Sequence, residues 1–116
     1  MLGAITGYNE DDPHIEIVTS PGSATVRVTT YGGGCHTKGE TEVQMVRMGA
    51  VVTPYDYIPT DPETVCTMQL VAFTHEATIT FAQGGPVQIR IRGMDARRRE
   101  AITVERSVVI PDAPAQ

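Results

Sequence analysis

The stretch that decides the fold is "ATITFAQGGPVQIRIR", residues 77–92. In 77–81 alanine, isoleucine and phenylalanine alternate with threonine, and in 87–92 valine and isoleucine alternate with glutamine and arginine. Apolar side chains at every second position are typical of strands that bury one face. The connection between the two is short, contains two glycines and ends in Pro86, where a strand can begin. The sequence therefore predicts two strands that pair as a β-hairpin.

The same alternation extends outward along the chain. Two segments are less regular. The apolar positions of 42–48 change parity between Met45 and Val46, which predicts a bulge, and Pro54 predicts that 50–57 is either an edge strand or a strand with a break. β-Branched residues within these segments and Gly and Pro between them disfavour helix. The further predicted strands are "HIEIV" (14–18), "ATVRVTTY" (24–31), "EVQMVRM" (42–48), "AVVTPYDY" (50–57), "CTMQLVAFTH" (66–75) and "AITVERSVVI" (101–110).

About eight short strands in 116 residues, with no long helical crossover, predict an all-β fold, an antiparallel two-sheet β-sandwich. In size and architecture this resembles an immunoglobulin-like domain. The chain has no tryptophan and its two cysteines are not placed to cross the centre of such a sandwich, which excludes an antigen-receptor type of domain. We expect an N-terminal arm at 1–13, a single β-sandwich domain at 14–110 and a C-terminal tail or linker at 111–116.

Charge is divided unevenly between the two parts of the chain. Residues 1–76 carry ten acids against three basic side chains, and 77–116 carry six arginines against four acids. The net charge of −5 argues against nucleic acid as a partner. The one basic run, "DARRRE" at 95–100, is interpreted as a solvated loop. No apolar run is long enough to cross a bilayer, so no transmembrane segment is predicted.

Two cysteines are the strongest single signal in the sequence. Cys35 follows the three glycines 32–34, and Cys66 follows the loop "IPTDPETV". A bond between them would close a loop of about 32 residues and stabilise the domain by roughly 3 to 4 kcal/mol. The sequence therefore predicts a disulfide, which suits a secreted, periplasmic or cell-envelope protein whose signal has been removed. No intact secretion signal opens the chain at "MLGAITGY", so a cytoplasmic location is the alternative.

A copper or zinc site is the alternative use of the same region. Cys35, His36, Cys66 and His75 are suitable ligand types, with His36 and His75 as the candidates that a disulfide would leave. Metal sites usually present ligands in close pairs, and no such spacing occurs here. The residues therefore predict no cofactor and no metal, and methionines such as Met45 are interpreted as core filler.

An enzyme is the third and weakest hypothesis. A small hydrolase needs a nucleophile, a base and an orienting group, and none of the histidines 14, 36 and 75 lies in a recognisable nucleophile motif. The paired acids lie in segments that are expected to be exposed. The sequence therefore predicts a protein that is not an enzyme.

The preferred hypothesis is a structural or protein-interaction module that binds another protein at the disulfide end. The disulfide would bring "YGGGCHTKGE" (31–40) and "PYDYIPTDPETVC" (54–66) together and present tyrosines, which make good contact residues. The candidate binding residues are Tyr31, His36, Tyr55, Asp56, Tyr57, Asp61 and Glu63.

Overall fold

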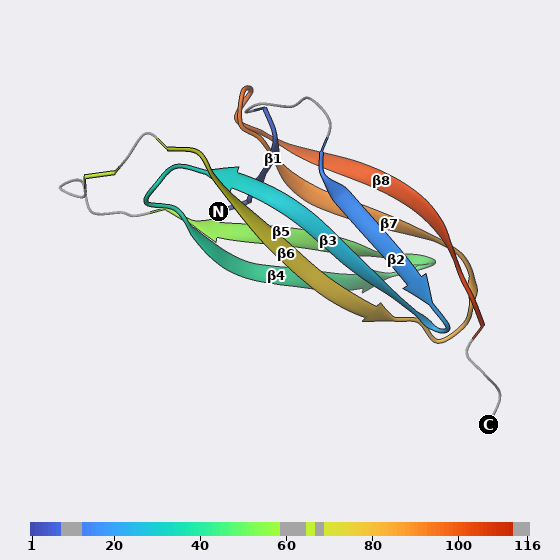
Figure 1. Cartoon of the computed structure of the whole chain (residues 1–116). Coiled ribbons are helices and arrows are strands. Elements are labelled where there is room, and N and C mark those ends of the chain that lie inside the picture. Colours follow the sequence, from blue (N-terminus) through green and yellow to red (C-terminus); the bar gives the residue numbers. More distant parts are fainter. Residues whose placement is uncertain (8–12, 59–64, 67–68, 113–116) are drawn as a thin grey trace.

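A computed structural model describes residues 1–7, 13–58, 65–66 and 69–112. Within these residues the fold is all-β, with eight strands and no helix (Figure 1). The predicted fold class is confirmed at this level. The strands are β1 (Ala4–Thr6), β2 (Ile15–Ser20), β3 (Ser23–Gly32), β4 (Thr37–Val46), β5 (Gly49–Tyr57), β6 (Val71–Thr80), β7 (Gly85–Asp95) and β8 (Glu100–Ile110).

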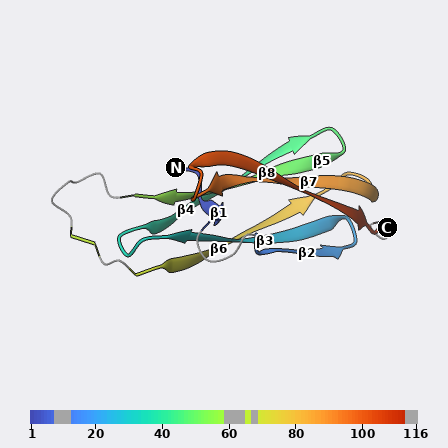
Figure 2. The ribbon, with the colours of Figure 1, turned by 90° about the horizontal axis from the view of Figure 1, so that it is seen from above.

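The eight strands form one curled sheet in place of two separate ones. Strands β2, β3 and β6 make one half, and β4, β5, β7 and β8 make the other; the two halves face each other (Figure 2). Strand β1 joins the halves, because it pairs antiparallel with β3 and parallel with β7. Strands β5 and β7 are also parallel. The prediction of purely antiparallel pairing is therefore wrong for these two pairs of strands.

The predicted N-terminal arm is wrong for residues 1–7, because β1 is a buried part of the sheet. Ile5 is almost fully covered and packs directly on the backbone of Gly93, where a Cβ would come within 2.8 Å of its side chain. Ahead of β1, Gly3 N–H donates to the carbonyl of Pro54 at 2.8 Å. The remainder of the expected arm, 8–12, lies outside the described residues.

The hairpin predicted from 77–92 is also wrong. Strand β6 pairs along its whole length with β3, and β7 pairs with β8, so the connection at 81–84 carries the chain from one half of the sheet to the other. The alternation itself is correct, since Val87, Ile89 and Ile91 are buried and the polar residues between them are exposed. A short glycine-containing connection fits a sheet-to-sheet passage as well as a hairpin.

Strand β5 is central, so the edge strand predicted from Pro54 is wrong, whereas the alternative, a break at the proline, agrees with its pairing. It lies between β4 and β7, and its pairing with β7 ends at Val52, before the proline. The bulge expected between Met45 and Val46 is absent, since the register between β4 and β5 runs evenly there. The apolar parity changes because β4 ends at Val46 and a turn follows, with Met48 at a φ of 64°.

The core fills the space between the two halves. Its buried aliphatic side chains come from β3, β5, β6 and β7, together with Ile5 of β1 and Ile110 at the end of β8. The described part of the chain holds no helix that could cross a membrane. The buried core residues are Ile5, Ala24, Val26, Val28, Ala50, Val52, Ile79, Val87, Ile89, Ile91 and Ile110.

Candidate functional site

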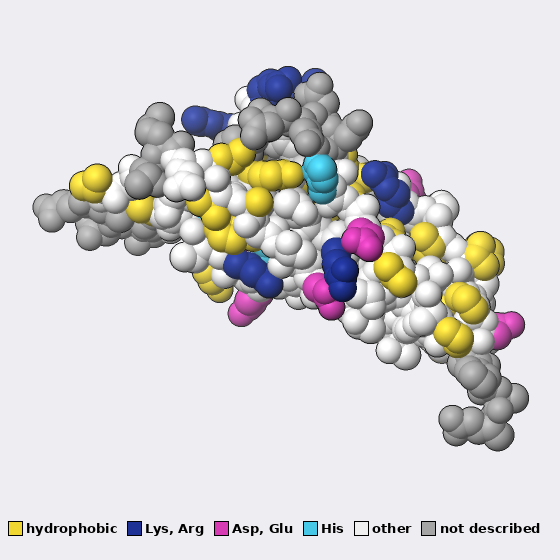
Figure 3. Space-filling view, viewed as in Figure 1, with side chains coloured by type: hydrophobic (Ala, Val, Ile, Leu, Met, Phe, Trp, Pro, Cys, Tyr) yellow, Lys and Arg dark blue, Asp and Glu magenta, His cyan; other side chains and the backbone are white. Residues whose placement is uncertain are grey.

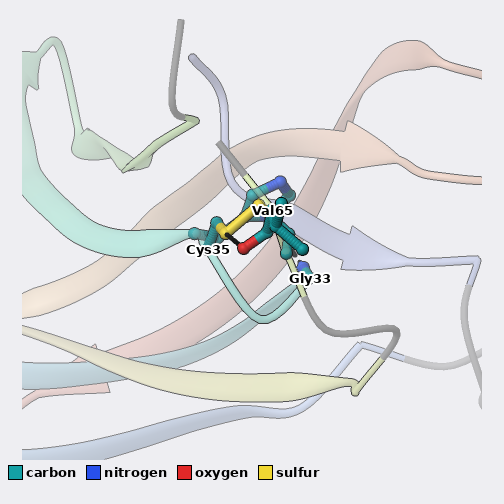
Figure 4. The surroundings of a disulfide bond; sticks show 5 residues. Gly33, Cys35 and Val65 are labelled. Carbon is teal, nitrogen blue, oxygen red and sulfur yellow. Dashed lines mark hydrogen bonds between the residues drawn. A yellow bond between two sulfur atoms is a disulfide. The ribbon is translucent and has the colours of Figure 1, made fainter. Parts of the chain in front are cut away.

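The predicted disulfide is confirmed. Cys35 lies in the turn after β3 and Cys66 in the connection between β5 and β6; their Cα atoms are 5.3 Å apart across a separation of 31 residues. Cys35 Sγ lies 3.6 Å from the carbonyl oxygen of Val65 (Figure 4). The turn is closed by two hydrogen bonds, from His36 N–H to the Gly33 carbonyl at 3.0 Å and from Gly33 N–H to His36 Nδ1 at 2.9 Å.

Apolar side chains stand exposed on the segments that this bond holds together. Tyr57 ends β5 with 54% of its surface exposed, and Val65, next to Cys66, is 93% exposed. Ile58 and Leu70 are exposed on the same connection. Contiguous apolar patches left open to solvent often mark binding surfaces. We call Tyr57, Ile58, Val65 and Leu70 the disulfide-end surface.

A buried polar cluster lies in the core behind this end. His75 of β6 is completely buried; its Nε2 lies 2.8 Å from Asp56 Oδ1 of β5, and its Nδ1 lies 2.8 Å from Thr41 Oγ1 of β4. Asp56 is also buried, and an added Cβ on Gly3 would sit 3.0 Å from its Oδ2. One residue from each of three strands therefore fixes the two halves of the sheet to each other at this end.

Asp56 carries its charge despite being buried. Burial is the largest single effect and raises the pKa of the carboxyl, but the hydrogen bond with His75 Nε2, the Thr30 hydroxyl, the charge of His75 and the Gly39 N–H together lower it by more. The net effect is a pKa below the ordinary value of an aspartate. With Asp56 ionised, Nε2–H of His75 donates to it, and Thr41 completes the ring's hydrogen bonding at Nδ1.

Thr41, His75 and Asp56 have the side-chain types of a hydroxyl nucleophile, a base and an orienting acid. Both ring nitrogens of His75 already have partners within the protein, and the ring has 0% of its surface exposed. Such a ring holds strands in place, and a substrate carbonyl would have to displace part of the core to reach it. The arrangement is suited to structural support of the disulfide-end surface.

The other candidate binding residues lie as follows. Tyr31 on β3 is half-buried and makes an edge-on ring contact with His14, with centroids 6.5 Å apart. Tyr55 is half-buried. Asp56 departs from the expectation, because its side chain points inward to His75 and not toward a partner. Asp61 and Glu63 lie outside the described residues.

The residues of the alternative metal site are not assembled as a ligand set. Cys35 and Cys66 are bonded to each other, His36 Nδ1 accepts from its own turn, and His75 is enclosed in the core. Across residues 1–7, 13–58, 65–66 and 69–112, no group of three or more His, Cys, Asp or Glu side chains is placed to hold a metal ion.

Sequence reasoning missed the Asp56–His75 pair, although the signal was present. Asp56 shares strand parity with the buried Val52, and His75 shares parity with the buried Ile79. Alternation alone therefore places a carboxylate and an imidazole on inward faces, where each needs a partner. Their pairing across the sheet depends on topology, which alternation does not give.

Charged side chains occupy the middle of the outer face of β2, β3 and β6. Arg27 Nε lies 2.8 Å from Glu76 Oε2, and its Nη1 lies 4.0 Å from Glu16 Oε2. Figure 3 shows basic and acidic side chains together at the centre of this face and apolar ones toward both ends. These exposed pairs contribute little to stability.

The basic run at 95–100 forms the turn between β7 and β8. Asp95 Oδ1 accepts hydrogen bonds from the backbone N–H groups of Arg97 and Arg98, and the three arginine side chains are exposed.

Comparison of the chain with protein-family models, with curated proteins and with solved structures finds no match.

Proposed function

We propose that the chain is a non-catalytic, disulfide-stapled β-module of a secreted, periplasmic or cell-envelope protein, and that it binds another protein through the disulfide-end surface. The single observation that carries the proposal is the exposure of Tyr57, Ile58, Val65 and Leu70 beside a covalent staple. In this proposal the two facing halves of the curled sheet act as the two sheets of an immunoglobulin-like sandwich do, as a rigid support for binding loops.

The physical basis is the low cost of ordering this surface. The disulfide restrains both chain segments before a partner arrives, so less conformational entropy is lost on binding. Tyr57 supplies a large ring with few rotatable bonds and a hydroxyl for a hydrogen bond, which is the usual composition of an energetic centre in an interface. The partner that fits has an apolar patch with a polar rim.

Two further observations support the non-catalytic and extracytoplasmic parts of the proposal. The Thr41–His75–Asp56 cluster is the described arrangement nearest to a catalytic one, and its imidazole is buried with both nitrogens engaged. A structural disulfide is favoured in an oxidising compartment and is rare where thiols are kept reduced.

Site-specific photocrosslinking in the cells that make the protein tests the proposal. Tyr57 is replaced by p-benzoyl-phenylalanine, and Val109, an exposed apolar residue of β8 outside the disulfide-end surface, carries the same probe as a matched control. We expect one discrete crosslinked protein from position 57 and none from position 109. With that partner in hand, Tyr57→Ala should weaken binding by more than about 1 kcal/mol, roughly fivefold, without changing thermal stability.

Identical crosslinking patterns from positions 57 and 109 would contradict the proposal, as would Tyr57→Ala with unchanged affinity for the captured protein. A combined Arg97→Ala, Arg98→Ala and Arg99→Ala variant serves as the electrostatic control. Because those arginines are exposed, we expect it to alter only the salt dependence of binding.

A further inference from the structure

Strand β4 forms an edge of the sheet, and its Thr41 is bonded to His75 of β6 in the other half. It pairs with β5, and no other strand among the described residues pairs with its opposite side. Between Thr41 and Val46 its register is regular. An edge of this kind presents a row of backbone donors and acceptors to any strand that approaches it.

The position of Pro54 shows which backbone groups of β4 point away from β5. Pro54 lies opposite Thr41, and its carbonyl accepts from Gly3 on the side away from β4, so this pair exchanges no ladder hydrogen bonds. Because pairs alternate along an antiparallel ladder, Val43 and Met45 likewise direct their N–H and C=O groups away from β5. Because Thr41 is held against β6 by its bond to His75, the open part of the edge offers two donors and two acceptors, at Val43 and Met45.

The outer part of this edge lacks the usual protection against pairing. Residues 43–46, "VQMV", contain no charge and no proline, and Met45 is 52% exposed although it lies on the core-facing side. Lys38 and the one register irregularity, which are protective features, lie at the other end of the strand. Next to the open stretch is an apolar hollow of about 440 Å³ whose lining includes Met45, Met48, Phe81 and Val87.

We propose that a second copy of this chain occupies the β4 edge, pairing antiparallel about a twofold axis that passes through Gln44. Such an axis is perpendicular to the sheet, so the core-facing side chains of both copies stay on the same face of the joined sheet. Because side chains alternate between the two faces along a strand, the axis must then pass through a residue and not between two residues. Centred on Gln44, Val43 of one copy lies opposite Met45 of the other. Both have outward backbone groups, and the two equivalent pairs make four hydrogen bonds.

Neighbouring registers fit less well. An axis through Glu42 would set two glutamates directly against each other, which is unfavourable. An axis through Val43 would place Met45 of the copy against Thr41, where β4 is held to β6 by the bond to His75. An axis through Met45 would extend the pairing beyond Val46, where the strand ends. In the Gln44 register, Glu42 faces Val46 and no like charges meet.

The resulting dimer is weak and depends on concentration. Two short edges bury less than the roughly 1,200 Å² typical of stable complexes, which suggests a Kd in the micromolar range or above. Each copy carries a net charge of −5, so salt should strengthen association by screening the repulsion between copies. An interface built on ion pairs would show the opposite dependence on salt.

Sedimentation velocity of the purified chain from roughly 10 μM to 1 mM tests the proposal, a range chosen to span the affinity expected for an interface of this size. We expect a monomer–dimer equilibrium that strengthens between low and high salt. Met45→Lys should abolish the dimer, because it places a charge opposite Val43 of the other copy, whereas Val109→Lys on β8, a comparable exposed apolar site, should not. Both variants should keep the circular dichroism spectrum and the melting temperature of the parent within error.

Disulfide trapping fixes the register. Gln44→Cys should form a covalent dimer under mild oxidation, since residues directly opposite in a non-hydrogen-bonded pair have Cβ atoms about 4.5–5.5 Å apart. Ser107→Cys, an exposed site on β8, is the control. A monomer at all concentrations, dimerisation unaffected by Met45→Lys, or equal trapping from positions 44 and 107 would overturn the inference. Trapping through Val43→Cys in place of Gln44→Cys would overturn the register and the reasoning behind it.

Discussion

Removal of the Cys35–Cys66 bond should lower the free energy of unfolding by an amount that the structure sets. The bond spans 31 residues, and the loop-closure estimate for that length is ~3.7 kcal/mol at 25 °C. Cys35 is half-buried and Cys66 is exposed, so replacing both with serine removes little packing. Nearly all of the loss should therefore come from the greater freedom of the unfolded chain, and it amounts to about a quarter or more of a small domain's stability.

The assay is urea denaturation of the wild type and of the Cys35→Ser, Cys66→Ser variant, each with and without a reductant, followed by far-UV circular dichroism. We expect the variant to lose ~3.7 kcal/mol and the wild type to match it once reduced. The m-value should rise in both cases, because an uncrosslinked unfolded chain exposes more surface. The reductant should leave the variant unchanged.

Variant stability within about 1 kcal/mol of the oxidised wild type would refute this reasoning. It would mean that the segment between the two cysteines unfolds separately from the rest of the domain, so that the bond restrains a loop already free in the native state. The disulfide-end surface would then not be pre-ordered, and the entropic argument for binding there would fail with it.

Three other predictions concern the core. Asp56 has a lowered pKa in the folded protein, so its contribution to the free energy of unfolding is present above the unfolded pKa near 4 and is lost as pH falls through the folded pKa. Asp56→Asn should therefore flatten the fall in stability below about pH 4, measured by urea titration. An unchanged dependence of stability on pH would contradict the assignment. Thr41→Val should cost about 1 to 3 kcal/mol by leaving His75 Nδ1 without a partner, whereas a neutral effect would mean that water or another group replaces the hydroxyl. Ile89→Ala should cost roughly 2 to 5 kcal/mol and Arg90→Ala well under 1 kcal/mol in thermal or urea unfolding, and equal costs would disprove the alternation.

Strand positions and faces were predictable from the sequence because burial on one side leaves a direct mark on it. Val26, Val28, Ile89 and Ile91 face the core as their alternation predicts. The disulfide was predictable for a similar reason, since two cysteines in 116 residues leave one possible pairing.

Strand partners were not predictable, because alternation gives the face of a strand and says nothing of its neighbour. The segment 77–92 looks like a hairpin, yet β6 and β7 pair with β3 and β8. Residues 1–7 are too short for a periodic signal, and β1 is recognisable only from the two strands that it joins. The same limit hid the Asp56–His75 pair, whose members are 19 residues apart and meet across the two halves of the sheet.

The pairing of strand β1 with β7 sets an order on the folding of this chain. Ala4 pairs with Met94, so the junction between the halves cannot close until β7 has been synthesised, and every earlier strand must wait without a completed core. Contacts this distant in sequence close slowly, in milliseconds to seconds for folds of this class. During that interval the uncharged stretch of β4 is exposed to neighbouring chains, so expression at high concentration should favour aggregation during folding over loss of the finished protein.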